Sequence, residues 1–313
     1  SETFLNSGSS SSFSNSKSNN YSRSTNINSG IRLKWNPDTL TTITFRPSFS
    51  YSESDSWSQS RTATFNDDPY SIAGVSDPLG AIFQDSIAAL RGITVNTNHR
   101  RSMGDSKSTS FNGWGMIVRR LNNEGRNASL SFWGGYGDSK SRNFSRSDIQ
   151  YFQRTDGNNR QFSNQYTNSP SKNWNYGARL SYSEPIVKNL HAQFNYQYDY
   201  SYSSNDRSLY QLDSLQGWRD MYNPALGTYP TDADSLRYAL NVRNSQYATY
   251  KNYTHRIGVG LRYNTKTIQA HAAIDMQPQR TKLSYQKDKL DTVVTRNVFN
   301  LSPNIRFRYK ISE

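Results

Sequence analysis

The sequence predicts an all-β protein: an antiparallel transmembrane β-barrel of about ten long strands, which is part of a larger barrel. Three observations predict this fold. Apolar and polar residues alternate with period two over long stretches, short turns alternate with long connections, and the chain holds 22 Tyr, 14 Phe and 6 Trp among 313 residues. So many aromatic side chains argue against disorder, because disordered segments are poor in residues that bury apolar surface.

The clearest alternation covers residues 174–202. Its apolar members form two runs, which are Trp174, Tyr176, Ala178, Leu180 and Tyr182, and then Leu190, Ala192, Phe194, Tyr196, Tyr198, Tyr200 and Tyr202. Successive side chains of a strand point to opposite faces, so this hairpin has one apolar and one polar face. We expect Phe194, Tyr196 and Tyr198 to face lipid, and Asn195 and Gln197 to face the lumen.

The same hairpin unit recurs along the chain. Two alternating runs are present in each of residues 31–51, 114–136 and 253–276, and a last strand covers residues 299–311. In the second unit the apolar face is expected to carry Trp114, Met116 and Val118. The expected first strand is the Ser-rich stretch of residues 2–14. The pattern thus gives about ten strands of about ten residues or more, against a usual length of five or six.

The connections between these runs alternate in length. Short turns are expected near residues 37, 124, 186 and 264. Long loops are expected over residues 55–105, 141–171, 204–246 and 286–295. Short turns on one side and long loops on the other are typical of a transmembrane barrel, and residues 1–313 are then a single barrel segment.

Two further elements follow from this arrangement. Trp35 and Trp174 are expected next to short turns, in an aromatic girdle at the membrane interface. Apolar residues within 71–92 predict a helix inside the longest loop, packed against that loop.

Other protein classes fit the composition less well. A large soluble β-sheet protein or adhesin stays open as an alternative, because alternation is expected of any half-buried sheet. Charged residues in mid-strand favour a wet lumen over a sandwich core. The net charge of +13 does not indicate a nucleic-acid partner, because Lys and Arg are scattered singly. The chain has no Cys and no apolar run of about 20 residues, so disulfide scaffolds and helical membrane spans are excluded.

Two stretches carry a family resemblance. They are IRLKWNPDTLTTITFRPSFSY at residues 31–51 and NLSPNIRFRY at residues 300–309. Both are similar to barrel strands of the TonB-dependent-receptor-like outer-membrane β-barrel family of Gram-negative bacteria. The resemblance covers essentially the whole chain in style, but these stretches are structural and name no ligand.

The resemblance implies a parent protein with an N-terminal plug, preceded by a small carboxypeptidase-regulatory-like domain, and a barrel of about 22 strands. This sequence departs from that pattern. It has no recognisable plug or energy-coupling box, and its last residue is Glu313 rather than an aromatic one. We therefore expect an internal portion of about half a barrel, which cannot close on its own.

Catalytic and metal-binding motifs are not found. The four histidines are His99, His191, His255 and His271, and no two of them have metal-ligand spacing. No Walker loop, dinucleotide fingerprint or nucleophile elbow is present. We expect neither an enzyme nor a bound cofactor.

Binding residues are expected in the loop over residues 204–246. It holds Tyr210, Trp218, Tyr222 and Tyr229, beside Asp213, Asp220, Asp232 and Asp234. Aromatic rings with carboxylates suit a sugar or peptide ligand, although the same rings could simply pack the loop against itself. Asp67, Asp68, Asp232 and Asp234 could hold Ca²⁺, but solvated acidic turns are the simpler interpretation.

Two functions follow from the resemblance and the pattern. The first is a barrel segment of an outer-membrane transporter that takes up a nutrient, such as a glycan, a peptide or a metal chelate. Its partners would be outer-membrane lipid, the remainder of the barrel and plug, a surface lipoprotein and the energy-coupling protein. The second is a non-transporting surface barrel whose loops mediate adhesion or assembly.

Overall fold

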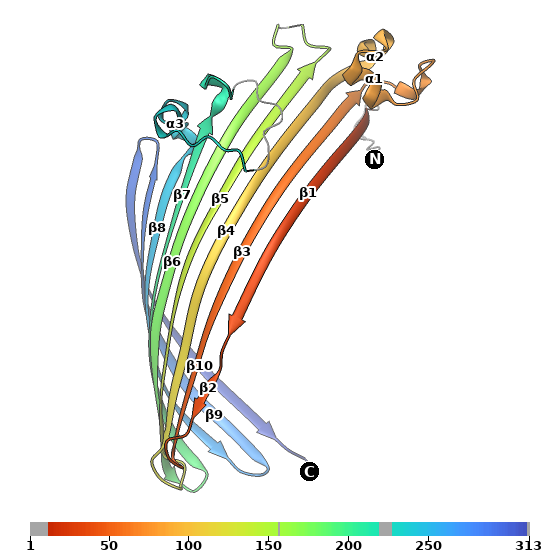
Figure 1. The fold of residues 1–313 in the computed structure, drawn as a ribbon. Coiled ribbons are helices and arrows are strands. Elements are labelled where there is room, and N and C mark those ends of the chain that lie inside the picture. Colours follow the sequence, from red (N-terminus) through yellow and green to blue (C-terminus); the bar gives the residue numbers. More distant parts are fainter. Residues whose placement is uncertain (1–11, 156, 219–226, 312–313) are drawn as a thin grey trace.

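The computed structural model describes residues 12–155, 157–218 and 227–311, which form one long, curved antiparallel sheet (Figure 1). Ten strands build the sheet: β1 (Phe13–Gly30), β2 (Leu33–Trp35), β3 (Thr41–Phe65), β4 (Thr94–Arg120), β5 (Asn127–Tyr151), β6 (Arg160–Val187), β7 (Leu190–Gln211), β8 (Gln246–Asn264), β9 (Ile268–Lys287) and β10 (Leu290–Tyr309). The prediction of an all-β antiparallel fold with ten strands is confirmed.

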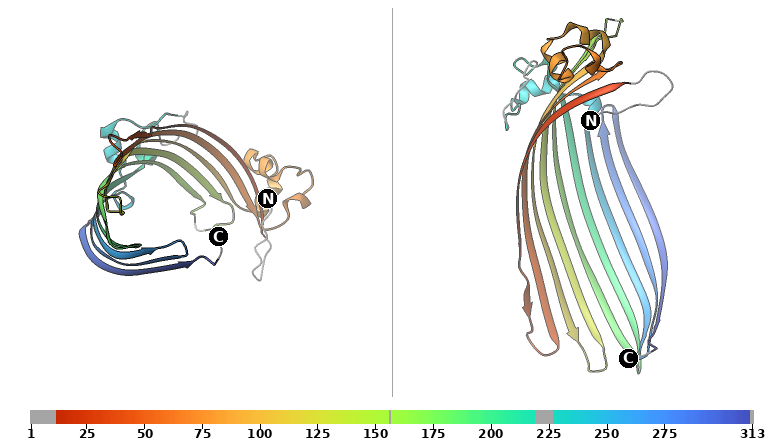
Figure 2. Two further views of the ribbon diagram at one scale, coloured as in Figure 1. Left: turned by 90° about the horizontal axis from the view of Figure 1, so that it is seen from below. Right: turned by 90° about the vertical axis from the view of Figure 1, so that its right-hand side faces the viewer.

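Strand order follows the chain. Each strand from β3 to β10 pairs with its sequence neighbour, and β1 and β2 both pair with β3. Within the described part of the chain, β1 and β10 are edge strands that do not pair with each other. Figure 2 shows the result: the sheet curls into an open arc, with β8, β9 and β10 facing β3 and β4 across the concave side.

Pro47 of β3 interrupts the pairing that would otherwise join β1 and β2 into one strand. Ile31 donates its N–H to the carbonyl of Pro47 at 3.1 Å, but Pro47 has no N–H to return to Ile31. The ladder therefore lapses at residues 31 and 32, and it resumes where Leu33 pairs with Phe45. The expected first strand, residues 2–14, lies almost entirely outside the described residues. Residues 13 and 14 belong to β1, which extends well beyond the range expected for that strand.

Most of the expected long loops are wrong, because the strands continue into them. The connections observed are residues 66–93, 152–159 and 212–245, in place of 55–105, 141–171 and 204–246. The added strand segments are polar on one face and carry only scattered apolar residues, such as Met103 and Phe144, on the other. They therefore show little apolar alternation, yet they keep a regular ladder such as Asp55 opposite Asp105. Hydrogen bonding of the backbone does not depend on that alternation.

The expected loop over residues 286–295 is also wrong. β9 turns into β10 through Asp288 and Lys289 alone, and Asp288 has the left-handed φ of 51° that such a tight turn needs. At the other end of the sheet, the turns lie at residues 36–40, 121–126, 188–189 and 265–267, close to the short turns expected near 37, 124, 186 and 264.

Short helices occupy the end of the sheet opposite these turns. Two of them, α1 (Pro78–Gln84) and α2 (Ala88–Ile93), lie in the expected helical region of residues 71–92. Leu79, Ile82 and Leu90 are buried against Phe65 of β3. A third, α3 (Ala233–Ala239), lies in the connection between β7 and β8. The described residues also include the 3₁₀ turns η1 (Pro69–Ser71), η2 (Leu212–Ser214) and η3 (Val242–Asn244). Among the helices of the described part, none is long and apolar enough to cross a membrane.

Candidate functional site: the apolar band and the polar concave face

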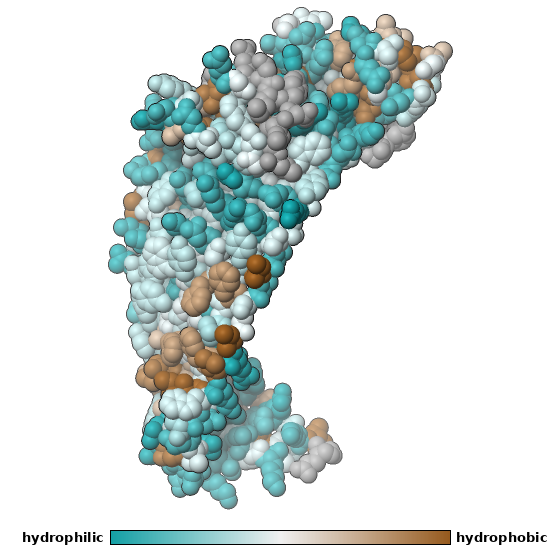
Figure 3. Space-filling model, in the orientation of Figure 1, coloured by the Kyte–Doolittle hydropathy of each residue, from teal (hydrophilic) through white to brown (hydrophobic). Residues whose placement is uncertain are grey.

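One register row crosses nine strands with apolar side chains alone. From β2 to β10 its members are Trp35, Ile43, Ile117, Leu130, Leu180, Tyr196, Ile257, Met276 and Leu301. Figure 3 shows apolar residues gathered across the lower strands on the visible, convex side of the sheet. We call this surface the apolar band. Many of its side chains are exposed: Leu130 is 42% exposed and Leu180 is 45% exposed, although they belong to interior strands.

The adjacent row has the opposite character. It contains Lys34, Thr44, Met116, Ser131, Arg179, Gln197, Arg256, Gln277 and Asn300. These side chains point to the concave face, because neighbouring residues of a strand alternate between faces. An apolar convex face and a polar concave face are the arrangement of a sheet that separates hydrocarbon from water.

Aromatic rows border the apolar band. Near the short turns lie Trp35, Tyr182, Tyr263 and Tyr309, and at the other margin lie Tyr136, Trp174, Tyr176, Tyr200, Tyr202 and Tyr253. Trp174 stacks on Tyr202 with ring centroids 3.8 Å apart, and Tyr200 lies 5.0 Å from Tyr253. The eight residue steps from Trp174 to Tyr182 span about 27 Å along the strand, which suits the apolar height of an outer-membrane barrel once the strand is tilted.

Two expectations about tryptophans need correction. Trp174 lies at the upper margin of the apolar band. It is far from the turn at residues 188–189, because it sits in the middle of β6, which runs from Arg160 to Val187. Trp114 lies on the concave face together with Met116 and Val118, where the Arg46 guanidinium sits 5.1 Å from the Trp114 ring. The apolar face of β4 is instead formed by the residues between them, which include two glycines: Phe111, Gly113, Gly115 and Ile117.

The glycines of this region give space to aromatic rings. A Cβ on Gly115 would lie 2.2 Å from the ring of Phe132, and one on Gly177 would lie 2.5 Å from the ring of Trp133. Real Cβ atoms do not approach so closely, so both glycines are required by packing. The Phe132 ring thus lies over Gly115 of β4 on the convex side, and the Trp133 ring lies over Gly177 of β6 on the concave side.

Basic residues predominate on the lower concave face. The basic ones are Lys34, Arg46, Arg120, Arg179, Arg256, Arg262, Arg306 and Arg308, and the acidic ones are Asp199 and Asp275. Arg179 donates to the Asn195 side-chain oxygen at 3.4 Å, and Arg256 donates to that of Gln277 at 3.4 Å. The face therefore carries mobile, hydrated positive charge with neutral amides between the guanidinium groups.

Serine lines the upper concave face. Every even-numbered residue of β3 from Ser48 to Ser60 is Ser, and Ser102, Ser106, Ser108 and Ser110 follow on β4. Ser50 and Ser110 share a hydrogen bond of 2.6 Å across the strands, and Ser58 and Ser102 share one of 2.7 Å. This lining was missed at the sequence level, although Ser at every second position is itself a period-two pattern.

The expected loop residues Tyr210, Trp218 and Tyr229 come together, while Tyr222 lies outside the described residues. They pack on the convex face above the apolar band. Trp218 meets the Phe144 ring edge-on at 5.6 Å, and Tyr210 stacks on Tyr166 at 5.6 Å. The rings thus pack against strands of the sheet, and not only against their own loop. A ligand role for these residues stays a prediction.

Tyr229 is the most deeply buried of the three and lies beside an ion pair. Arg142 binds Asp105 through its Nε at 2.9 Å, and the Arg142 guanidinium stacks on the Tyr229 ring at 4.3 Å. Burial, and secondly the Asp105 carboxylate, raises the pKa of Tyr229. The phenol therefore stays neutral, and the cluster holds the connection between β7 and β8 against the sheet.

The acidic residues considered for Ca²⁺ have local roles instead. Asp68 accepts from the N–H of Tyr70 at 3.0 Å, and Asp232 accepts from the N–H of Asp234 at 3.2 Å. Both are N-cap residues, of η1 and α3 respectively. Asp213 accepts from Gln211 at 2.6 Å, and Asp220 lies outside the described residues.

The histidines do not assemble a metal site. In the described ranges no three His, Cys, Asp or Glu side chains are grouped so as to hold a metal ion. His99 is partly buried beside Gln59 at 3.1 Å and Arg101 at 3.2 Å, and burial, followed by the nearby arginines, lowers its pKa. His255 shares a hydrogen bond of 3.0 Å with Tyr196 within the aromatic part of the convex face.

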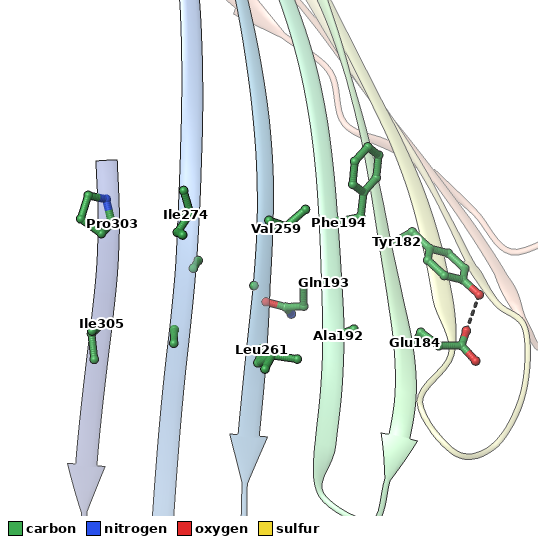
Figure 4. A pocket seen from close by; sticks show the side chains of 13 residues that line it. Tyr182, Glu184, Ala192, Gln193, Phe194, Val259, Leu261, Ile274, Pro303 and Ile305 are labelled. Carbon is green, nitrogen blue, oxygen red and sulfur yellow. Dashed lines mark hydrogen bonds between the residues drawn. The ribbon is translucent and has the colours of Figure 1, made fainter. Parts of the chain in front are cut away.

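An apolar hollow lies inside the apolar band (Figure 4). It has a volume of about 690 Å³, and its apolar lining includes Phe194, Val259, Leu261, Ile274, Pro303 and Ile305. At its edge Tyr182 donates a hydrogen bond to Glu184. Apart from Tyr182, Glu184 and Gln193, the lining of this open hollow is apolar or glycine, so it suits hydrocarbon chains.

Comparisons with known proteins give no family assignment. No family model matches the chain, and no curated protein matches it. Among solved structures, the chain is similar to the crystal structure of BauA, the ferric preacinetobactin receptor from Acinetobacter baumannii, with a TM-score of 0.39 and 7% sequence identity. The match covers 95% of this chain and 45% of the BauA chain, so this chain spans less than half the length of that protein.

Proposed function

We propose that this chain is a segment of an outer-membrane β-barrel that belongs to a TonB-dependent-receptor-like transporter for a nutrient. The observation that carries the proposal is the pair of adjacent register rows, one apolar from Trp35 to Leu301 and the other, except for Met116, polar from Lys34 to Asn300. A soluble protein would need a covering layer on the apolar row. In the described part of the chain, no helix or loop covers it.

The aromatic margins support the same placement. Tyr and Trp are favoured where hydrocarbon meets headgroups, because each has an apolar ring and a polar tip. The open edges of β1 and β10 support the segment hypothesis, since unpaired backbone groups are not tolerated against lipid. Further strands would satisfy both edges.

The concave face supports passage of a hydrated solute. Arg179, Arg256 and Arg262 line it with positive charge that would attract anionic solutes. A nutrient bearing carboxylates, such as an acidic glycan, an acidic peptide or an anionic metal chelate, is the class that this charge favours. No catalytic step is part of the proposal.

A non-transporting surface barrel is the second candidate. The strands from β3 to β6 extend far above the apolar band, and the folded connection between β7 and β8 is fixed to their convex face. Such a platform would present loops to a partner at the cell surface.

Cysteine labelling tests the placement. Single-Cys variants at Phe194, Tyr196 and Tyr198 and at the intervening Asn195 and Gln197 would be made in the full-length protein in membranes. We expect a water-soluble maleimide to label the second set and spare the first. Equal labelling of both sets would contradict membrane insertion.

Uptake separates the two candidates. Compounds removed from the growth medium would be compared between cells with and without the full-length protein, with and without a protonophore that collapses the inner-membrane gradient. Energised transport is supported if one class of compound is no longer taken up, both by cells treated with the protonophore and by cells that lack the protein. An unchanged profile, together with lost surface attachment, supports the adhesion role.

A further inference from the structure

A basic groove lies on the convex face at the upper margin of the apolar band. It is formed by β8, β9 and β10 and has a volume of about 730 Å³. Its cations are Lys251, Arg280 and Lys282, and Tyr253 and Phe299 contribute rings. Lys251 and Lys282 are register partners, and Arg280 is the partner of Tyr253, so the three cations occupy two neighbouring rows.

No carboxylate among the described residues neutralises these three cations. None of them forms an ion pair with a residue in the part of the chain that the structure describes. The basic residues at similar height on β4 and β6 differ in this respect: Lys107 pairs with Glu53 at 2.7 Å, and Lys172 lies 3.9 Å from Asp138. The groove is therefore a local excess of positive charge.

The groove continues directly into the apolar band. Below Lys282 and Arg280, the convex side chains of β9 are Pro278, Met276 and Ile274, all of them apolar. A ligand seated here meets cations at one end and hydrocarbon-compatible surface at the other. Soluble anions would use only the first half of this surface.

We infer that this groove binds the phosphate headgroup of an anionic lipid, with the acyl chains of that lipid lying on the apolar band. The inference rests on the proposed membrane insertion and adds a ligand to it. Lys251 and Lys282 contact the phosphate as point charges, and Arg280 offers a planar fork to two of its oxygens. Tyr253 lies at the headgroup level, where its ring meets the first carbons of the chains.

Native mass spectrometry of the full-length protein in non-ionic detergent tests the inference. The probe is dioleoyl phosphatidic acid, with dioleoyl phosphatidylcholine and glycerol 3-phosphate as comparison ligands. The test variant combines Lys251→Gln, Arg280→Gln and Lys282→Gln. The matched control combines Arg256→Gln, Arg262→Gln and Arg306→Gln, which removes the same charge from β8 and β10 on the concave face.

We expect tight binding of phosphatidic acid to the wild type and the control, and about 100-fold weaker binding to the test variant, because each basic residue near an anionic headgroup contributes about fivefold. Equal loss in test and control variants would overturn the inference. So would glycerol 3-phosphate binding as tightly as the lipid, since that would show a site for a soluble anion.

Two checks keep the outcome clear. Folding of each variant is verified by heat-modifiable gel mobility, and Lys282→Gln alone, at an exposed position, replaces the triple variant if that one does not fold. Failure of the lipid site is distinct from failure of the proposed function. Alternating cysteine labelling with no lipid preference would reject the groove alone, whereas uniform labelling would reject membrane insertion.

Discussion

The lower and upper parts of the same sheet differ in what their two faces meet. In the lower part, apolar residues such as Leu180 and Ile257 lie on the convex face and polar ones such as Arg179 on the concave face. In the upper part, both faces are polar: Ser lines one face, and ion pairs such as Asp105 with Arg142 occupy the other, around a compact aromatic cluster.

The two parts share one backbone ladder without interruption from β3 to β6, apart from a shift at the end of β3. Pairing of the strands therefore does not require that one face of the sheet be apolar and the other polar. The side chains differ instead: the two faces of the lower part contrast in polarity, as the proposed membrane insertion requires, and the two faces of the upper part do so much less.

A charge placed in the lower part should have the largest effect. Ile257→Arg puts a guanidinium in the middle of the apolar band, and we expect a loss of about 2–4 kcal/mol in the free energy of unfolding in lipid vesicles. Urea titration followed by tryptophan fluorescence measures it. The matched control is Asn195→Arg on the neighbouring strand β7, at a concave position, and it should cost much less. Equal losses would show that both faces meet the same solvent.

Filling a glycine under a ring should have the next largest effect. Gly177→Ala places a Cβ 2.5 Å from the Trp133 ring, and we expect a cost of about 1–3 kcal/mol from overpacking. At Gly134 the nearest neighbour of a new Cβ is the Asn175 carbonyl oxygen at 3.6 Å, so Gly134→Ala should be tolerated. Denaturant titration compares the two variants, and similar midpoints would refute the packing role of Gly177.

Removing a ring from the upper part should have a smaller and local effect. Trp218→Ala deletes the edge-on contact with Phe144, which contributes about 1 kcal/mol. We expect faster hydrogen exchange over residues 227–245, with the strands of the apolar band unchanged. Tyr238→Ala, at a side chain that is 88% exposed in the same connection, should leave exchange unaltered. Faster exchange throughout the sheet would show that the two parts are not independent.

Acid should loosen the connection between β7 and β8 weakly, at the cap of α3. Hydrogen bonds from Ser235 and Asp234 lower the pKa of Asp232 below its ordinary value of 3.8. The cap of α3 is therefore fully present above pH 3.8 and is lost as the pH falls through the lower, folded-state pKa. Pepsin cleavage near residues 233–239 should increase between pH 4 and pH 2. Asp232→Asn, which caps without a charge, should remove most of that dependence.

The sequence predicted the lower part well and the upper part poorly. Around Tyr196 and Ile257 the alternation identified the strands, their partners and the apolar face, because the two faces differ in polarity. Residues 55–65 and 94–105 were expected to be loop, since their few apolar residues give little contrast in hydropathy. In β4, the small Gly113 and Gly115 concealed the apolar face, so Trp114 was assigned to it in error.

The candidate site could be predicted in full only where its apolar and polar residues alternate with period two. Tyr210, Trp218 and Tyr229 were singled out as aromatic loop residues, and the structure brings them together. Tyr210 lies on β7 rather than in a loop, and its contact with Tyr166 is a register pair of β6 and β7. The contact of Trp218 with Phe144 could not be foreseen, because it depends on how the connection between β7 and β8 folds back onto β5. The basic groove likewise arises from the register of β8 with β9, which places Lys251 opposite Lys282.

The run of serines has a geometric consequence. A serine side chain carries only one atom beyond Cβ, so the wall from Ser48 to Ser60 is thin and its inner surface lies close to the backbone. Long side chains there would extend further from the sheet, whereas the short hydroxyl groups leave the space beside the concave face open. They still offer hydrogen-bond donors and acceptors to whatever lies against that face.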